Sequence, residues 1–152
     1  MSSSPTDERQ PLIRGARSGL SEIMRFLHTS ITVRDMDESL AFYTDVLGLE
    51  FERRRPIPEN HAEIAFVRDP LSDARIELTH WEGKNAIDPG EQLDHLAFQV
   101  PELDPFLARA RSMGVRVAKE PYRLQGGTGR IAFILDPNDV WIELIERPAA
   151  SQ

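Results

Sequence analysis

The stretches IAFVRDPLSDARIELTH, residues 64–80, and IAFILDPNDVWIELIE, residues 131–146, are two copies of one pattern. In both copies an Asp-Pro turn separates two apolar runs, and the second run places a glutamate between apolar neighbours. The two copies begin 67 positions apart, and His28 and His95 have the same separation. The sequence therefore predicts two related modules in tandem.

Each copy is preceded by the same series of expected elements. Residues 25–33 alternate polar and apolar side chains as a half-buried strand does, with Leu27 and Ile31 on the apolar face. A helix is expected from Asp35, a suitable N-cap, to Gly48, a suitable stop. Three further strands follow, and the second half of the chain repeats the series. The fold class is therefore α+β, with two βαβββ modules at residues 24–82 and 93–147.

The composition is that of one ordinary domain. The chain has 152 residues, of which 40% are hydrophobic and 28% charged, and its net charge is −7. Such an acidic chain is not expected to bind nucleic acid, and it has no apolar run of the roughly 20 residues that cross a membrane. Residues 1–23 are expected to be a flexible extension, and residues 24–148 are expected to form the domain. The protein is expected in the cytoplasm, because its N-terminus does not have the pattern of a secretory signal. Because there is no cysteine, a metal would be bound by His, Asp, Glu or water.

The alternation of side chains along the strands selects four candidate metal ligands: His28, Glu77, His95 and Glu143. Each is on the strand face opposite the apolar residues that pack on a helix. If a pseudo-two-fold axis relates the modules, the four side chains converge. A single such residue is usually a solvated strand residue, but the same pair in both modules favours a metal site. Two imidazoles and two carboxylates suit a nickel, cobalt, zinc, iron or manganese ion.

The other two histidines are interpreted differently. His80 is on the same face as Ile76 and Leu78 and is expected to be structural, and His61 is expected in a loop or at a strand edge. The segment GGTGR, residues 126–130, lacks the lysine pattern of a phosphate-binding loop and is interpreted as a flap beside the site.

Four segments of the chain resemble a known family. They are HTSITVRDMDESLAFYTDVLGLEF, IELTHWEG, DHLAFQV and GGTGRIAFILDPNDVWIELIE. Together with the tandem plan they resemble the vicinal oxygen chelate superfamily, and most closely glyoxalase I (lactoylglutathione lyase) of the short bacterial type. The resemblance covers residues 24–147 and implies a curved mixed sheet with the helices outside.

The resemblance also implies a site and a reaction. It assigns the metal to His28, Glu77, His95 and Glu143, and it favours nickel or cobalt. It implies conversion of a hemithioacetal of methylglyoxal and a thiol, in the family glutathione, to a 2-hydroxyacyl thioester through an enediolate. Glu143 is then the base and Glu77 the second carboxylate. A homodimer is implied, in which the first pair of ligands of one chain completes a site with the second pair of the other.

Three positions differ from the family pattern where that pattern binds glutathione. Thr32, Trp81 and Gln125 replace an arginine, an asparagine and a lysine, which removes charge-assisted hydrogen bonds of roughly 1.5 to 3 kcal/mol each. These positions, with Trp141, are the predicted substrate contacts. The two tryptophans would stack on an aromatic ligand or simply pack. Most of the nearby arginines are expected to be exposed charges on strand edges and loops. Those that could replace the lost charge are Arg53, Arg54, Arg55, Arg123 and Arg130.

Three alternative functions fit the same residues. A metal-dependent epimerase, such as one acting on an acyl-CoA, would use similar chemistry, although such relatives often have glutamine at the position of Glu77. An extradiol-type dioxygenase would bind iron through His28, His95 and Glu143. Glu77 argues against this function, because it would occupy the coordination position that oxygen needs. A small-molecule-binding or resistance protein would use the fold without catalysis.

Overall fold

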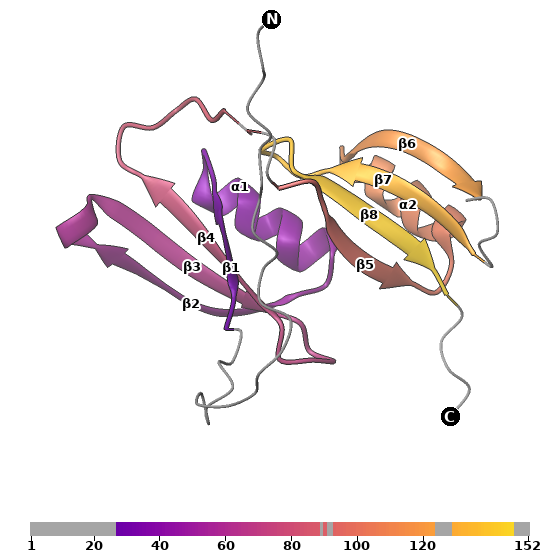
Figure 1. The fold of residues 1–152 in the computed structure, drawn as a ribbon, viewed down its shortest axis with the longest axis horizontal. Helices are drawn as coiled ribbons and strands as arrows, with labels where there is room; N and C mark the ends of the chain where they lie inside the picture. The colour runs from indigo at the N-terminus through magenta and orange to yellow at the C-terminus, as the bar shows by residue number, and fades with distance from the viewer. Residues whose placement is uncertain (1–26, 89, 91–92, 124–128, 148–152) are drawn as a thin grey trace, which may run out of the picture.

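The computed structural model describes residues 27–88, 90, 93–123 and 129–147, and it contains both expected modules (Figure 1). The first consists of β1 (Thr29–Thr32), α1 (Met36–Ala41), the π-helical segment η1 (Phe42–Val46), β2 (Glu50–Ile57), the 3₁₀ turn η2 (Pro58–Asn60), β3 (Ala62–Arg68) and β4 (Arg75–Trp81). The second consists of β5 (Leu96–Val100), α2 (Leu103–Ser112), β6 (Arg116–Arg123), β7 (Arg130–Leu135) and β8 (Trp141–Glu146). The βαβββ order predicted from the sequence is confirmed in both modules.

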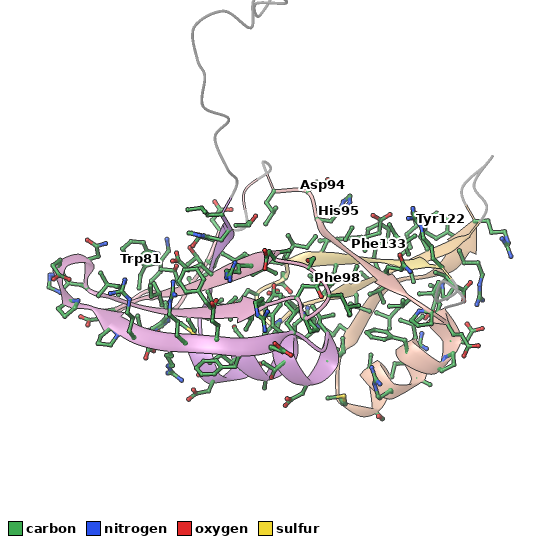
Figure 2. All side chains as sticks on the ribbon, turned by 90° about the horizontal axis from the view of Figure 1, so that it is seen from below. Trp81, Asp94, His95, Phe98, Tyr122 and Phe133 are labelled. Atoms are coloured by element: carbon green, nitrogen blue, oxygen red, sulfur yellow. The ribbon has the colours of Figure 1, made fainter. Side chains whose placement is uncertain are left out.

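Each module forms a four-stranded mixed sheet. The strand orders are β1-β4-β3-β2 and β5-β8-β7-β6. The first strand of each module pairs in parallel with the last, and the other neighbours are antiparallel. The two sheets lie side by side (Figure 1), and both helices lie on one side of them, with His95 and Tyr122 on the other (Figure 2). The α+β class with external helices is confirmed, and the expected sheet consists of two four-stranded halves.

Local sequence sets the ends of the first helix. The side chain of Asp35 accepts a hydrogen bond from the backbone N–H of Glu38 at 2.8 Å and so caps the helix as predicted. The predicted single helix is a six-residue α-helix that continues as η1. In η1 the Thr44 hydroxyl donates to the Leu40 carbonyl at 2.9 Å, a side-chain bond of the kind that bends helices. Gly48 then adopts a φ of 77°, a left-handed conformation that glycine takes without strain.

Both helices are short, with six residues in α1 and ten in α2. In the part of the chain that the structure describes, no helix has the length and the apolar character needed to span a bilayer.

One apolar core lies between the sheets and the helices, and it is shared by both modules. Full burial of a large aliphatic or aromatic side chain stabilises a fold by about 1.5 to 3 kcal/mol. The largest fully buried apolar side chains are those of Tyr43, Leu78, Leu103, Leu107, Ile134, Ile142 and Leu144.

A buried polar network joins the first helix to the turn between β7 and β8. Tyr43 donates a hydrogen bond to Asp136 at 2.9 Å, and Asn138 donates one to Ser39 at 3.0 Å. The side-chain oxygen of Asn138 also accepts the backbone N–H of Arg34 at 2.9 Å. Burial and the neighbouring Asp136 raise the pKa of Tyr43 well above its usual range, so its hydroxyl remains a donor. These bonds fix how the two modules sit against each other.

The start of the first strand differs from the prediction. β1 begins at Thr29, where its pairing with Ile76 begins, instead of at residue 25. Leu27, predicted on the apolar face, is 65% exposed because it precedes the paired part of the strand. The predicted extension, residues 1–23, lies outside the described residues.

Candidate metal centre and active site

The first pair of predicted ligands, His28 and Glu77, lies on the face of its sheet that points away from the helix. His28 Nε2 is 3.9 Å from Glu77 Oε2, and the two side chains are 34% and 18% exposed. The His28 ring packs edge-on against Phe66, with the ring centroids 5.1 Å apart. Phe66 is also the sheet partner of Glu77, so the three side chains form one cluster on one face.

Two hydroxyl groups hold the carboxylate of Glu77. Ser30 Oγ donates to Oε1 at 2.9 Å, and Thr79 Oγ1 lies 3.3 Å from the same oxygen. The two hydroxyls are 3.0 Å apart. The parallel pairing of β1 with β4 places Ser30 directly beside Glu77. The other carboxylate oxygen, Oε2, remains on the side of His28.

His95 and Glu143 form the equivalent pair in the second module. His95 Nε2 is 3.2 Å from Glu143 Oε2, and the side chains are 34% and 15% exposed. His95 Nδ1 lies 2.7 Å from the carboxylate of Asp94, to which it donates a hydrogen bond, so Nε2 is the nitrogen that faces Glu143. Phe133 packs edge-on against His95 at 5.9 Å, and Trp141 against Phe133 at 5.4 Å.

The two pairs occupy equivalent rows across their sheets. Residues that are directly paired on neighbouring strands have their side chains on the same face. In the first sheet the paired row runs through Arg53, Phe66, Glu77 and Ser30. In the second sheet it runs through Lys119, Phe133, Glu143 and Ala97. The rows match in having a cation, a phenylalanine and a glutamate, and they differ at the last position.

Within one chain the two pairs remain apart. Among the described residues, no three His, Cys, Asp or Glu side chains are grouped closely enough to hold one metal ion. The structure brings His28 to Glu77 and His95 to Glu143, but it does not bring all four together. We call the His28–Glu77 pair the first half-site and the His95–Glu143 pair the second half-site.

The donor atoms of the half-sites fit a divalent metal. Each half-site offers an imidazole nitrogen and a carboxylate oxygen that face each other and are partly exposed. Their remaining polar atoms have partners of the kind that orient metal ligands: Asp94 on the imidazole of His95 and Ser30 on the carboxylate of Glu77. A set of two nitrogens and two oxygens without thiolate suits borderline first-row ions.

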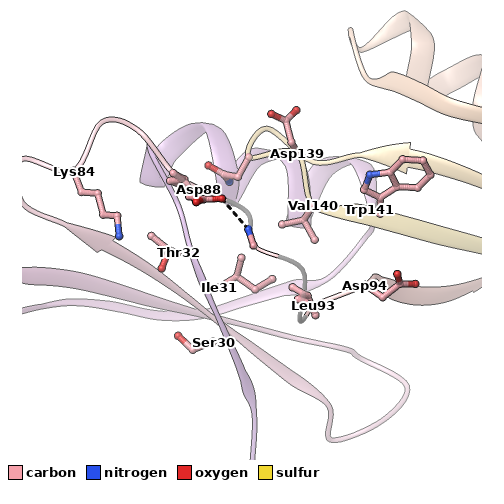
Figure 3. A pocket seen from close by; sticks show the side chains of 13 residues that line it. Ser30, Ile31, Thr32, Lys84, Asp88, Leu93, Asp94, Asp139, Val140 and Trp141 are labelled. Atoms are coloured by element: carbon pink, nitrogen blue, oxygen red, sulfur yellow. Dashed lines mark hydrogen bonds between the residues drawn. The ribbon is translucent and has the colours of Figure 1, made fainter. Parts of the chain in front are cut away.

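Three of the four predicted substrate residues line cavities beside the half-sites. Trp81 and Ser30 line a cavity of about 270 Å³ together with the glutamate of the first half-site. Thr32 and Trp141 line a larger cavity of about 620 Å³ between β1 and the start of β8 (Figure 3). Ser30 belongs to both cavities. Gln125 lies outside the described residues.

Two of the candidate arginines are engaged elsewhere. Arg54 forms hydrogen bonds and ion pairs with carboxylates of its own module, and Arg130 does the same with Glu146 and Asp104. Arg53 differs, because its guanidinium lies over the ring of Phe66 at 4.2 Å from the centroid. It therefore places a positive charge on the same face as the first half-site.

His80 and His61 lie outside the half-sites, as predicted. His80 Nδ1 donates to the Val33 carbonyl at 3.1 Å on the helix side of the sheet. His61 follows η2 in a left-handed conformation and lies 3.7 Å from Glu82. The predicted flap falls mostly on residues 126–128, outside the part of the chain that the structure describes.

Sequence reasoning missed four residues of the half-sites: Ser30, Phe66, Asp94 and Phe133. The two phenylalanines carried a signal, since they are 67 positions apart with matching neighbours in the repeat. Ser30 carried none, because its contact with the glutamate depends on which strand pairs with β1. Asp94 precedes β5, and its sequence context is that of an ordinary loop residue.

Comparisons with known proteins agree with the fold. Residues 25–144 match the family model of the Glyoxalase/Bleomycin resistance protein/Dioxygenase superfamily. The lactoylglutathione lyase of Salmonella typhimurium is 38% identical over 131 residues, which cover 85% of this chain and 97% of that protein. The crystal structure of glyoxalase I from Zea mays matches with a TM-score of 0.75 and 29% identity over 82% of this chain, which spans about half, 45%, of the maize chain. The trypanothione-dependent glyoxalase I of Leishmania major matches with a TM-score of 0.69 and 31% identity, over 82% of this chain and 87% of that one. The chain therefore belongs to the Glyoxalase/Bleomycin resistance protein/Dioxygenase superfamily, and lactoylglutathione lyases and glyoxalase I structures are among its relatives.

Proposed function

We propose that the protein is a metal-dependent lyase of the glyoxalase I type, which converts the hemithioacetal of methylglyoxal and a thiol into a 2-hydroxyacyl thioester. The observation that carries the proposal is the repetition of one half-site, a histidine beside a glutamate, at the same place in both sheets. The names of the relatives, lactoylglutathione lyase and glyoxalase I, favour this activity over the epimerase, dioxygenase and binding-protein alternatives.

One divalent metal ion per site would be held by His28, Glu77, His95 and Glu143. When bound, such an ion supplies Lewis-acid polarisation of substrate oxygens on adjacent carbons. We infer nickel or cobalt as the ion, with zinc, iron and manganese as alternatives that suit the same donors.

The contribution of the chain itself is a proton transfer. The reaction removes a proton from the carbon that carries sulfur and hydroxyl, and it adds one to the neighbouring carbonyl carbon. It therefore needs a base that can give the proton back. We assign this role to Glu143, whose carboxylate contacts His95. Glu77, held by the Ser30 hydroxyl, is the second carboxylate.

Glutathione is the thiol that we infer. Its two carboxylates lie at the two ends of the molecule, one on either side of its cysteine. Arg53 and Lys119 are the cations at equivalent places in the two rows, on the faces that carry the half-sites. Their positive charges would attract the carboxylates to an otherwise acidic protein. The Leishmania relative depends on trypanothione, so the thiol is a property to be measured.

We further infer a homodimer with its sites at the interface. Because one chain keeps the half-sites apart, the first half-site of one chain would complete a site with the second half-site of its partner. A two-fold axis then generates two equivalent sites. The cytoplasmic location expected from the sequence stays a prediction.

The proposal is tested with metal-free protein that is refilled with one ion at a time. Each preparation is assayed for thioester formation from methylglyoxal with glutathione and, separately, with a thiol that lacks carboxylates. We expect no turnover without metal, the highest rate with nickel or cobalt, and a clear preference for glutathione. Absence of thioester with every ion and every thiol would contradict the proposal.

A further inference from the structure

The two rows across the sheets differ at one end, and the difference falls on the glutamates. Ser30 is paired with Glu77, whereas Ala97 is paired with Glu143. Two residues after each glutamate, on the same face, the first module has Thr79 and the second has an isoleucine. The first glutamate thus has two hydroxyls beside it, and the second has alkyl groups in their place.

The hydroxyls fix one orientation of the Glu77 carboxylate. Ser30 Oγ donates to Oε1 at 2.9 Å, and Thr79 Oγ1 is 3.0 Å from Ser30 and 3.3 Å from Oε1. With Oε1 held, Oε2 is the oxygen that faces His28. The Thr79 side chain is itself buried, which limits the positions that the Ser30 hydroxyl can occupy.

Sheet formation does not require a serine at this position. Ser30 is exposed, and the equivalent strand of the second module forms the same parallel pairing with Ala97. Among the described residues, the carboxylate of Glu143 contacts the imidazole of His95. The hydroxyl of Ser30 therefore bonds to the carboxylate beside it and is not needed for the strand pairing.

We propose that Ser30 is a positioning residue that holds Glu77 as a fixed metal ligand, while the absence of its equivalent beside Glu143 leaves that glutamate free to move as the base. The inference rests on the proposed function and extends it, because it explains how a repeated half-site yields two different carboxylates. Removal of a residue that orients a metal ligand typically lowers metal affinity or activity by about 10- to 100-fold.

Three substitutions test the proposal: Ser30→Ala, Ser30→Thr and Ala97→Ser. Calorimetric titration of the metal-free proteins with nickel measures affinity without reference to activity, and kcat and KM are measured on the loaded proteins. We expect Ser30→Ala to weaken nickel binding about tenfold and Ser30→Thr, which keeps the hydroxyl, to restore it. Ala97→Ser places a hydroxyl beside Glu143, so we expect nickel affinity to be kept and kcat to fall with KM unchanged.

Two results with the variants would overturn the proposal. The first is nickel affinity in Ser30→Ala equal to that of the wild type, with the same thermal unfolding midpoint. The second is an unchanged kcat in Ala97→Ser. If the wild type binds nickel but forms no thioester, the proposed function fails and the titrations still decide the role of Ser30. A wild-type chain that binds none of nickel, cobalt, zinc, iron and manganese would overturn both.

Discussion

The carboxylates of Glu77 and Glu143 lie at the same position of their modules and have different neighbours. The first accepts a hydrogen bond from Ser30, and the second contacts His95 from 3.2 Å. A catalytic base has to move between two carbon atoms of the substrate, which a carboxylate with fewer fixed bonds does more readily. These surroundings support the proposal that the base belongs to the second module.

Replacing Glu143 with glutamine tests that assignment. The amide keeps the shape of the side chain but cannot take a proton, so we expect kcat to fall by about 100- to 10,000-fold. The thermal unfolding midpoint should stay close to that of the wild type, because the side chain is not part of the core. Full turnover in Glu143→Gln would remove this residue from the role of base.

Replacing Arg53 with methionine tests the binding of an anionic thiol. Arg53 is exposed, so the loss of its charge should raise KM for the glutathione adduct by only about three- to tenfold, with kcat unchanged. The adduct of a thiol without carboxylates should show no change. Arg111→Met is the matched control, since Arg111 lies on α2 and pairs with Glu120. An equal effect of both substitutions on KM would contradict a direct role for Arg53.

The sequence predicted the sheet face of the four candidate ligands because side-chain alternation and the repeat constrain it twice. Parity puts each histidine and glutamate on the face away from the helix, and the repeat shows that the choice is not accidental. The contact of Ser30 with Glu77 could not be predicted in the same way. It requires knowing that β1 lies parallel to β4 in a particular register, which is a property of the folded sheet.

At the scale of elements, Glu146 at the end of β8 connects three parts of the second module. It accepts the backbone N–H of Leu103, the first residue of α2, at 2.9 Å, and it receives two hydrogen bonds from Arg130 on β7. Arg130 also binds Asp104 in the first turn of that helix. The helix has no side-chain cap from its own N-cap residue, Glu102, so β8 supplies one.

This connection predicts a pH dependence of stability. The hydrogen bonds from Arg130 and then from Leu103 lower the pKa of Glu146 from 4.5 to about 2. Because the folded-state pKa is depressed, the stabilisation is complete above about pH 4.5 and is lost as the pH falls toward 2. Glu146→Gln should therefore be less stable than the wild type at neutral pH, with a difference that narrows between those values.

Urea unfolding midpoints measured from pH 7 to pH 2 check this expectation. Glu120→Gln is the control, because Glu120 forms an exposed ion pair that contributes little. A constant difference between the wild type and Glu146→Gln over the whole range would show that the ionisation of Glu146 does not stabilise the fold.

Element order was predictable and element boundaries were less so. Asp35 and Gly48 set the ends of the first helix as expected, but the change from α-helix to η1 within it was not visible in the apolar spacing. The first strand is shorter than its alternating pattern, because alternation continues beyond the part that has a partner strand. Patterns of polarity report which face is buried, whereas strand ends depend on pairing.

At the scale of the whole molecule, the fold supports the proposal that a site is built from two chains. The buried network of Tyr43, Asp136, Asn138 and Ser39 fixes the modules side by side. In that arrangement each sheet presents its half-site separately, and no three metal-binding side chains of the described residues gather at one point. In the proposed dimer, two-fold pairing of chains would bring opposite half-sites together and repeat the site.

Complementation between two inactive variants tests this account most directly. One variant carries His28→Ala with Glu77→Ala and lacks the first half-site. The other carries His95→Ala with Glu143→Ala and lacks the second. Each variant should be inactive alone. In a co-expressed equal mixture, half of the dimers contain one chain of each variant, and each such dimer has one intact site of two. Activity should therefore return to about a quarter of the wild-type value. A mixture as inactive as either variant would show that a site is not built from the half-sites of two chains.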